Sequence, residues 1–179
     1  MIILIGGASH TGKTNLAQKL LEKYQFPYLS IDHLKMGLIR SGLINVSVDE
    51  DEKITLYLWP ILKEIIKTAI ENHQNLIVEG AIYLLILKKV LVKNTKKKLI
   101  MFVLSWPKNI SKIILMTLNL CQCDWKKIGW FLLYVWSLIK ENEYNKRMCS
   151  RYGHKIVLID KDYDIDAIIN CHFSKIRCN

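Results

Sequence analysis

The sequence predicts an α/β fold in three layers, with a parallel sheet of about five strands between helices on both faces. Short apolar runs alternate along the chain with segments of helical spacing, which is typical of such a sheet. Apolar residues make up 51% of the chain and charged residues 23%, as expected for a globular protein. We therefore expect residues 1–179 to form a single domain.

The first half of the chain contains two predicted strands around a helix. Ile2 to Ile5 is an apolar run that ends at two glycines, the pattern of a buried parallel strand. Asn15 to Tyr24 has helical spacing, and Tyr28 to Ile31 is a second short strand that closes on Asp32.

The remaining elements follow the same alternation. An acidic turn at Asp49 suits a helix N-terminus, and that helix is expected to run to His73 with a kink at Pro60. A second helical stretch covers Leu138 to Tyr152. Three further strands are predicted, at Leu76 to Val78, Leu99 to Leu104 and Lys155 to Ile159.

The segment after the first strand matches the pattern G-x-x-x-x-G-K-[ST] at every fixed position. In such a phosphate-binding loop (P-loop), glycines let consecutive N–H groups point at the anion, and the following helix adds its N-terminal dipole. The lysine reaches the β- and γ-phosphates, and the hydroxyl of the last residue ligates Mg²⁺. We expect ATP and Mg²⁺ at Gly7, Ala8, Ser9, His10, Thr11, Gly12, Lys13 and Thr14, although loop geometry alone suffices to explain the variable position His10.

Two carboxylates and one arginine are candidates to complete the site. Glu79 ends the third strand, where it could support Mg²⁺ or stand as a solvated strand-end residue. Asp32 ends the second strand at the mouth of the ligand crevice, where it could position an acceptor hydroxyl or accept its proton. It could also cap the next helix, and the two roles are compatible. Arg40 could face an anionic acceptor or serve only at the surface.

Bulk composition restricts the partners. The net charge of +10 could attract an anionic partner, but the lysines are spread along the chain, which favours a Lys-rich surface. We expect no specific nucleic acid, because the tryptophans lack interleaved basic residues and are expected to be buried. These are Trp106, Trp125, Trp130 and Trp136.

The compartment follows from cysteines and the N-terminus. Five cysteines without a C-x-x-C pair indicate neither a zinc site nor a disulfide framework. The start of the chain lacks a secretory signal. Because both observations fit a reducing compartment, we expect a cytoplasmic protein. Residues 128–139 carry no charge but are too few to span a bilayer, so a buried helix or an interfacial segment is expected there. Membrane association is a minor alternative.

Three segments resemble bacterial P-loop kinase-like proteins that are usually labelled adenylate kinase or 2-phosphoglycerate kinase. They are residues 5–14, residues 29–42 and residues 76–80, and residues 138–160 resemble the C-terminal part of that family. The lack of an Asn-Lys-x-Asp guanine reader and the small size also favour a nucleoside-monophosphate-kinase-like fold. The resemblance implies ATP- and Mg²⁺-dependent phosphoryl transfer to a small-molecule acceptor. The sequence leaves open which molecule the acceptor is and what the oligomeric state is.

Residues 81–137 depart from the family pattern. Asp124 is the only acidic residue between Glu79 and Glu141, whereas a kinase lid mixes arginines with acids, and a shift of the reading frame would explain this composition. No arginine lies between Arg40 and Arg147, so Arg147 and Arg151 are the remaining candidates to reach over the phosphates. The alternative function is therefore a nucleotide-binding protein with little or no catalysis.

Overall fold

The computed structural model describes residues 1–48, 50–80, 99–107, 128–159 and 164–174. The predicted helix start at Asp49 and most of the atypical segment 81–137 lie outside the described residues. In chain order the elements are β1 (Ile2–Gly7), α1 (Lys13–Tyr24), β2 (Tyr28–Ser30), α2 (Ile31–Arg40), α3 (Asp51–Glu71), β3 (Leu76–Glu79), β4 (Leu99–Ser105), α6 (Ile128–Tyr152), β5 (Lys155–Leu158) and α7 (Ile165–Phe173).

The five strands form one parallel sheet in the order β2-β3-β1-β4-β5. β1 lies at the centre, with Ile5 opposite both Glu79 of β3 and Phe102 of β4. Because all strands are parallel, their carboxyl ends meet at one edge, and this edge carries the loop after β1. The predicted α/β class and the five parallel strands are confirmed.

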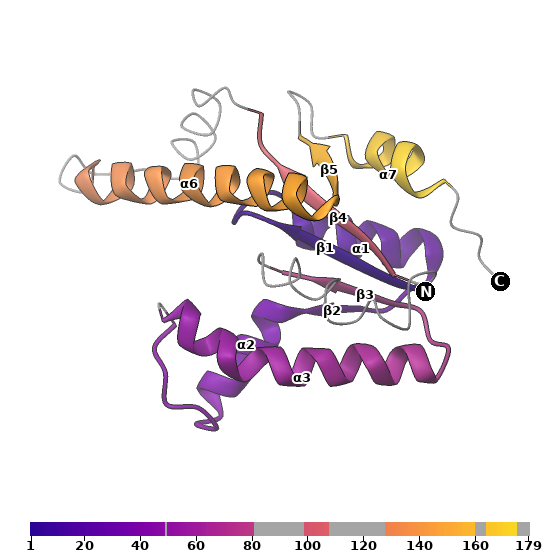
Figure 1. Ribbon diagram of the computed structural model, residues 1–179, viewed down its shortest axis with the longest axis horizontal. Helices are drawn as coiled ribbons and strands as arrows, with labels where there is room; N and C mark the ends of the chain where they lie inside the picture. Colours follow the sequence, from indigo (N-terminus) through magenta and orange to yellow (C-terminus); the bar gives the residue numbers. More distant parts are fainter. Residues whose placement is uncertain (49, 81–98, 108–127, 160–163, 175–179) are drawn as a thin grey trace.

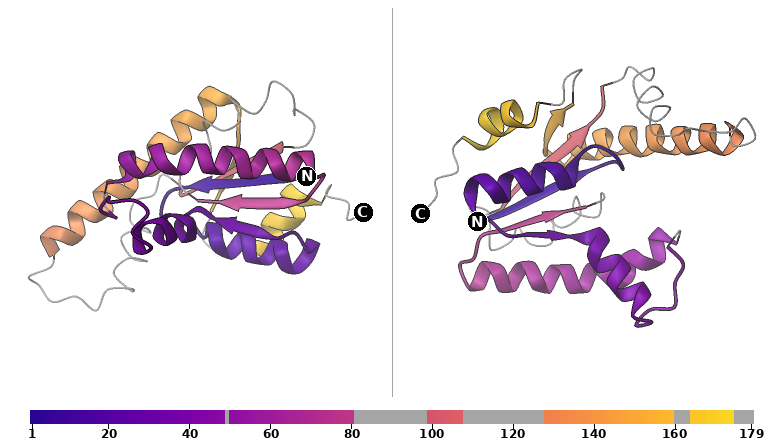
Figure 2. Two further views of the ribbon diagram at one scale, coloured as in Figure 1. Left: turned by 90° about the horizontal axis from the view of Figure 1, so that it is seen from below. Right: turned by 180° about the vertical axis from the view of Figure 1, so that it is seen from behind.

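Alternate residues of β1 divide the core into two clusters. Ile2 and Leu4 pack with α3, α2 and Cys149 of α6 on one face of the sheet. Ile3 and Ile5 pack with α1 and α7 on the other face, which Figure 2 (right) shows from behind. Period-2 alternation in a strand buried on both sides produces this division, so the sheet has helices on both faces, as predicted.

Three helices differ from their predicted bounds, and α1 begins at Lys13, two residues before the predicted Asn15. α3 is one continuous helix of 21 residues with Pro60 inside it, and it begins at Asp51 after an N-cap at Glu50. α6 begins at Ile128, so the uncharged stretch 128–139 and the helix predicted from Leu138 form one helix. Its N-terminal half extends beyond the carboxyl ends of the strands (Figure 1). Among the described residues, no helix has the length and apolar character that crossing a membrane requires.

Candidate functional site

The P-loop folds sharply between β1 and α1. Gly7 has φ +148°, and a Cβ atom on it would lie 2.5 Å from the Leu104 carbonyl oxygen of β4. His10 (φ 61°) and Gly12 (φ 79°) adopt left-handed backbone, and Gly12 is the N-cap of α1. Glycine is the residue that tolerates both the positive φ and the close approach of a neighbouring strand. The loop therefore presents its N–H groups and the start of a helix at one point, as phosphate binding requires.

Lys13 is a largely buried cation at the base of this loop. Its side chain is 9% exposed, and Nζ donates to the Ala8 carbonyl oxygen at 2.9 Å. Burial lowers the pKa of the Lys13 ammonium below its ordinary value, while the nearby carboxylates of Glu79, Asp32 and Glu141 act in the opposite direction. The loop thus holds a desolvated positive charge that an anion would stabilise.

Thr14 and Glu79, the two predicted metal ligands, are hydrogen-bonded to each other. Thr14 Oγ1 donates to Glu79 Oε1 at 3.1 Å, which links the first turn of α1 to the carboxyl end of β3. Glu79 is fully buried, so it is not the solvated strand-end residue that was the alternative. Its second oxygen, Oε2, is buried and has no hydrogen-bond partner in the described structure.

This pair fits a divalent cation. Mg²⁺ prefers oxygen ligands and is usually bound by one or two carboxylates together with substrate phosphates. A hydroxyl and a buried carboxylate with an unused oxygen, beside a phosphate-binding loop, provide such ligands. Within the described part of the chain, no cluster of three or more His, Cys, Asp or Glu side chains could hold a metal by itself.

Asp32 lies in the first turn of α2, near the P-loop. The helix begins at Ile31 and its N-cap is Ser30, so Asp32 is neither the last residue of β2 nor the helix cap. Its side chain is exposed, and its charge acts on Lys13. Gly80 fixes this end of α2, because a Cβ there would lie 2.7 Å from Cβ of Ile31.

The three arginines predicted for the site lie apart from this cluster. Arg40 is exposed in the last turn of α2, about 12 Å along the helix axis from Asp32. Arg147 and Arg151 are exposed on α6, about 9 and 15 Å farther along its axis than Glu141, towards the start of β5.

The side of α6 that carries Arg147 and Arg151 also faces away from the sheet. The buried stripe of α6 consists, among the residues with described side chains, of Val135, Leu138, Asn142, Asn145 and Cys149. At roughly 100° per residue, Arg147 falls opposite to this stripe. The structure therefore does not bring Arg147 or Arg151 to the P-loop.

α6 instead brings three other residues to the site, which sequence reasoning missed. Glu141 Oε2 accepts from the Ser9 N–H at 3.3 Å, and His10 Nε2 lies 2.5 Å from the Tyr134 hydroxyl oxygen. Asn142 fixes the helix to the end of β4 through Ser105 and Trp106. Tyr134 and Glu141 are seven residues, or about two helical turns, apart. This spacing places both on one face of a helix, but it does not indicate that the face meets the P-loop.

One predicted burial was wrong. Trp136 is 57% exposed, and Lys140 Nζ lies 3.9 Å from its ring centroid in a cation–π contact. Trp106 is partly buried as expected, whereas the side chains of Trp125 and Trp130 lie outside the described residues.

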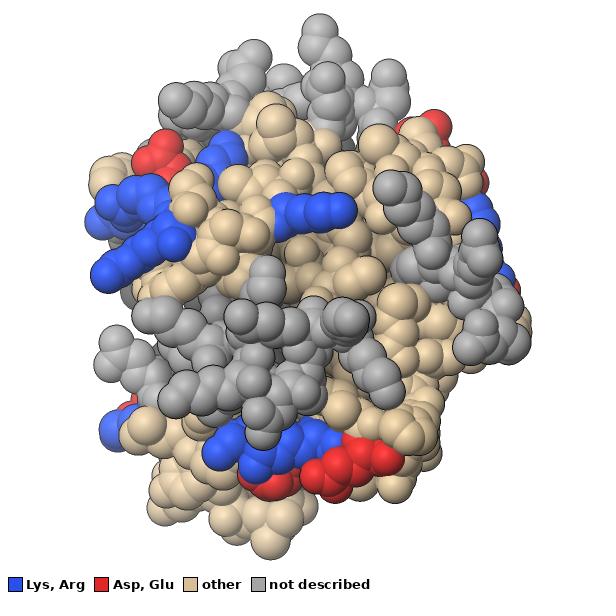
Figure 3. Space-filling model, turned by 45° about the vertical axis from the view of Figure 1, so that its right-hand side comes forward, with Lys and Arg blue, Asp and Glu red and all other residues tan. Residues whose placement is uncertain are grey.

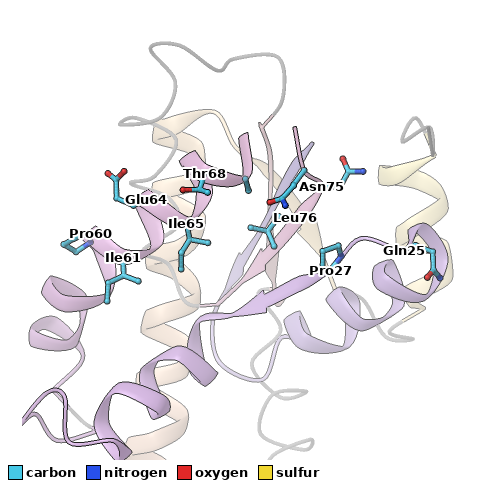
Figure 4. A pocket seen from close by; sticks show the side chains of 11 residues that line it. Gln25, Pro27, Pro60, Ile61, Glu64, Ile65, Thr68, Asn75 and Leu76 are labelled. Atoms are coloured by element: carbon cyan, nitrogen blue, oxygen red, sulfur yellow. The ribbon is translucent and has the colours of Figure 1, made fainter. Parts of the chain in front are cut away.

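A large cavity lies at the opposite edge of the sheet. Its volume is about 1010 Å³, and Figure 4 shows Pro60, Ile61, Glu64 and Ile65 of α3 on one side of it, with Leu76 at the start of β3 on another. The P-loop lies at the carboxyl ends of the parallel strands, whereas this cavity lies at their amino ends. The cavity is therefore separate from the candidate site.

The basic side chains do not form one continuous field on the face shown in Figure 3. Lys and Arg lie there in separate groups, and acidic side chains adjoin some of them. Several lysines pair with carboxylates on their own helix, such as Lys19 with Glu22 and Lys67 with Glu64. Such exposed pairs contribute little to stability.

Comparison with solved structures identifies the fold. The chain is similar to shikimate kinase from Acinetobacter baumannii in complex with shikimate (14% identity, TM-score 0.57, covering 98% of this chain and 95% of that one). It is also similar to a gluconokinase from Sinorhizobium meliloti 1021 (14%, TM-score 0.54, 97% of both chains) and to dephospho-CoA kinase from Campylobacter jejuni (11%, TM-score 0.54, 98% of both chains). No protein-family model and no curated protein sequence matches the chain.

These likenesses establish a nucleoside-monophosphate-kinase-like P-loop fold. At this level of identity, similarity to solved structures shows the architecture alone. The reaction has to be inferred from the residues of the site.

Proposed function

We propose that the chain is a phosphotransferase that uses ATP and Mg²⁺ to phosphorylate a hydroxyl of a small molecule. The observation that carries this proposal is the convergence of buried Lys13 and the Thr14–Glu79 pair on one P-loop. In the transfer, a bond forms between the acceptor oxygen and the γ-phosphorus of ATP. The bond from that phosphorus to the ADP oxygen breaks, and ADP leaves.

Each residue has a role set by its place. The P-loop N–H groups of residues 7–14 would hold the triphosphate, and Lys13 would neutralise charge on its outer phosphates. Thr14 and Glu79 would hold Mg²⁺, which would neutralise charge on the phosphates. Asp32 would orient the acceptor hydroxyl and take its proton.

The acceptor belongs to a broad class: a nucleotide, a sugar or a glycerate-type metabolite. The fold neighbours named for shikimate, gluconate and dephospho-CoA support a small hydroxyl-bearing acceptor. Arg40, on the last turn of α2, is the residue we assign to an anionic group of that acceptor.

A second candidate function is nucleotide binding with little or no phosphoryl transfer. The placement of Arg147 and Arg151 on the outer face of α6 favours it, because an arginine over the phosphates can contribute about 10³–10⁵ in rate. Lys13 and a bound Mg²⁺ would then have to neutralise the phosphates without an arginine from α6.

One experiment separates the two functions. The full chain is incubated with Mg-ATP and a panel of nucleosides, nucleotides, sugars and glycerate phosphates, and ADP release is measured. A phosphotransferase shows acceptor-stimulated ADP release that Lys13→Ala abolishes. Saturable Mg-ATP binding without turnover on any acceptor supports the second function.

A further inference from the structure

α6 lies across the outer side of the P-loop through two contacts. Glu141 Oε2 accepts from the backbone N–H of Ser9, and the Tyr134 hydroxyl contacts His10 Nε2. The two side chains are seven residues apart, so they lie on the same face of the helix. Ser9 and His10 are consecutive residues of the loop, so one face of α6 contacts it at two adjacent positions.

The contact at Ser9 places a negative charge where a P-loop binds anions. The N–H groups of such a loop point at phosphate, and here one of them donates to a carboxylate. The Glu141 charge is also close enough to Lys13 to favour its ammonium form, although Glu79 and Asp32 act more strongly. The Glu141 carboxylate thus acts on the same two groups that a nucleotide phosphate would use, a loop N–H and the Lys13 ammonium.

We propose that Glu141 competes with the terminal phosphate of a bound nucleoside triphosphate, and thereby sets the affinity of the site for triphosphate relative to diphosphate. The inference rests on the proposed nucleotide site and deepens it. Binding of a triphosphate requires the Glu141 carboxylate to leave Ser9, or to remain near a phosphate of like charge. Either event weakens triphosphate binding, and diphosphate binding is affected less because the γ-phosphate carries the additional charge.

The test is Glu141→Gln in the full chain, with titrations of Mg-ATP and Mg-ADP followed by calorimetry. Glutamine preserves size and removes the charge. We expect Mg-ATP to bind about fivefold to tenfold more tightly, because one close like charge at a partly exposed site is removed. The affinity for Mg-ADP should change by less than about twofold. Glu143→Gln is the matched control, because Glu143 is exposed two residues along α6 and its loss changes net charge equally.

The outcomes distinguish the inference from the proposed function. Unchanged or weaker Mg-ATP binding in Glu141→Gln, with clear binding by the unaltered chain, overturns the inference alone. Equal tightening in Glu143→Gln also overturns it, because the effect would then be one of net charge. Absence of binding in every variant overturns the proposed function and the inference with it. If Glu141→Gln does not fold, Glu141→Ala is measured in the same way, with the same expectation.

Discussion

Glu79 is a carboxylate that folding has removed from water without giving both of its oxygens a partner. The Thr14 hydroxyl satisfies Oε1, whereas Oε2 has no hydrogen-bond partner in the described structure. A buried charge left in this state costs free energy, and binding of the proposed Mg²⁺ would offset that cost. The strand-end position was visible in the sequence, but the burial depends on α1 packing over β3.

Glu79→Gln should separate metal binding from folding. Glutamine retains an oxygen to accept from Thr14 but removes the negative charge that attracts Mg²⁺. We expect the gain in ATP affinity on adding Mg²⁺ to fall by about tenfold or more, measured by titration with and without the metal. Glu71→Gln, at the exposed end of α3, should leave that gain unchanged. Equal Mg²⁺ dependence in Glu79→Gln and the unaltered chain would contradict the assignment.

Lys13 should make the free energy of unfolding depend on pH. Its pKa in the folded chain is lowered by burial, so between that pKa and the ordinary value of 10.5 the unfolded state binds more protons. The free energy of unfolding therefore rises as the pH increases through this window, and below it the cost of the buried ammonium is present in full.

Lys13→Met removes this cost. We expect its thermal unfolding temperature to exceed that of the unaltered chain at pH 7, with the difference shrinking as the pH approaches 10.5. Lys19→Met, on the exposed side of the same helix, serves as the control and should change stability little. A lower unfolding temperature for Lys13→Met at pH 7 would refute the argument.

At the scale of elements, the turn from β1 into α1 depends on a glycine that packs against a neighbouring strand. A Cβ on Gly7 would lie 2.5 Å from the Leu104 carbonyl oxygen and 2.9 Å from Thr11 Oγ1. The motif predicted glycine here for its backbone freedom. The contact with β4 was not predictable, because it depends on which strand lies beside β1.

Gly7→Ala should therefore destabilise the chain strongly. We expect a loss of about 3 kcal/mol in the free energy of unfolding, measured by denaturant titration, because neither backbone has room to move. Gly37 lies inside α2, and a Cβ added to it would have no atom within 4 Å, so Gly37→Ala should stabilise by about 0.5–1 kcal/mol. Similar effects of the two substitutions would show that the close approach to β4 is absent.

Two asparagines one turn apart on α6 make a sharper comparison. Asn142 accepts from the Ser105 hydroxyl and the Trp106 N–H, both at 3.0 Å, and donates to the Trp106 carbonyl oxygen at 3.2 Å. Asn145 is fully buried, but neither of its amide atoms has a hydrogen-bond partner in the described structure.

Asn142→Ala should cost about 2–3 kcal/mol in the free energy of unfolding, because it leaves buried partners without a hydrogen bond. Asn145→Leu should be neutral or stabilising, because it removes an unsatisfied amide from the core. Denaturant titration of both variants measures the difference. A larger loss for Asn145→Leu than for Asn142→Ala would contradict the packing of α6.

For the whole molecule, the alternation of apolar runs and helices was enough to predict the sheet and its parallel strands. That residues 128–139 join the following stretch in one helix was not predictable, because twelve uncharged residues suit a buried helix or an interfacial segment equally. The candidate site likewise contains residues that the sequence predicts and residues that it does not. Lys13, Thr14 and Glu79 follow from local pattern and strand ends, whereas Tyr134 and Glu141 meet the P-loop only through the packing of a distant helix.

The central claim is that this fold holds a nucleoside triphosphate at the loop between β1 and α1. Calorimetric titration of the full chain with Mg-ATP tests it most directly. We predict a single saturable site whose affinity falls by about tenfold or more in Lys13→Ala, while Lys19→Ala binds as the unaltered chain does. Absence of saturable binding, or equal binding by Lys13→Ala, would contradict the claim.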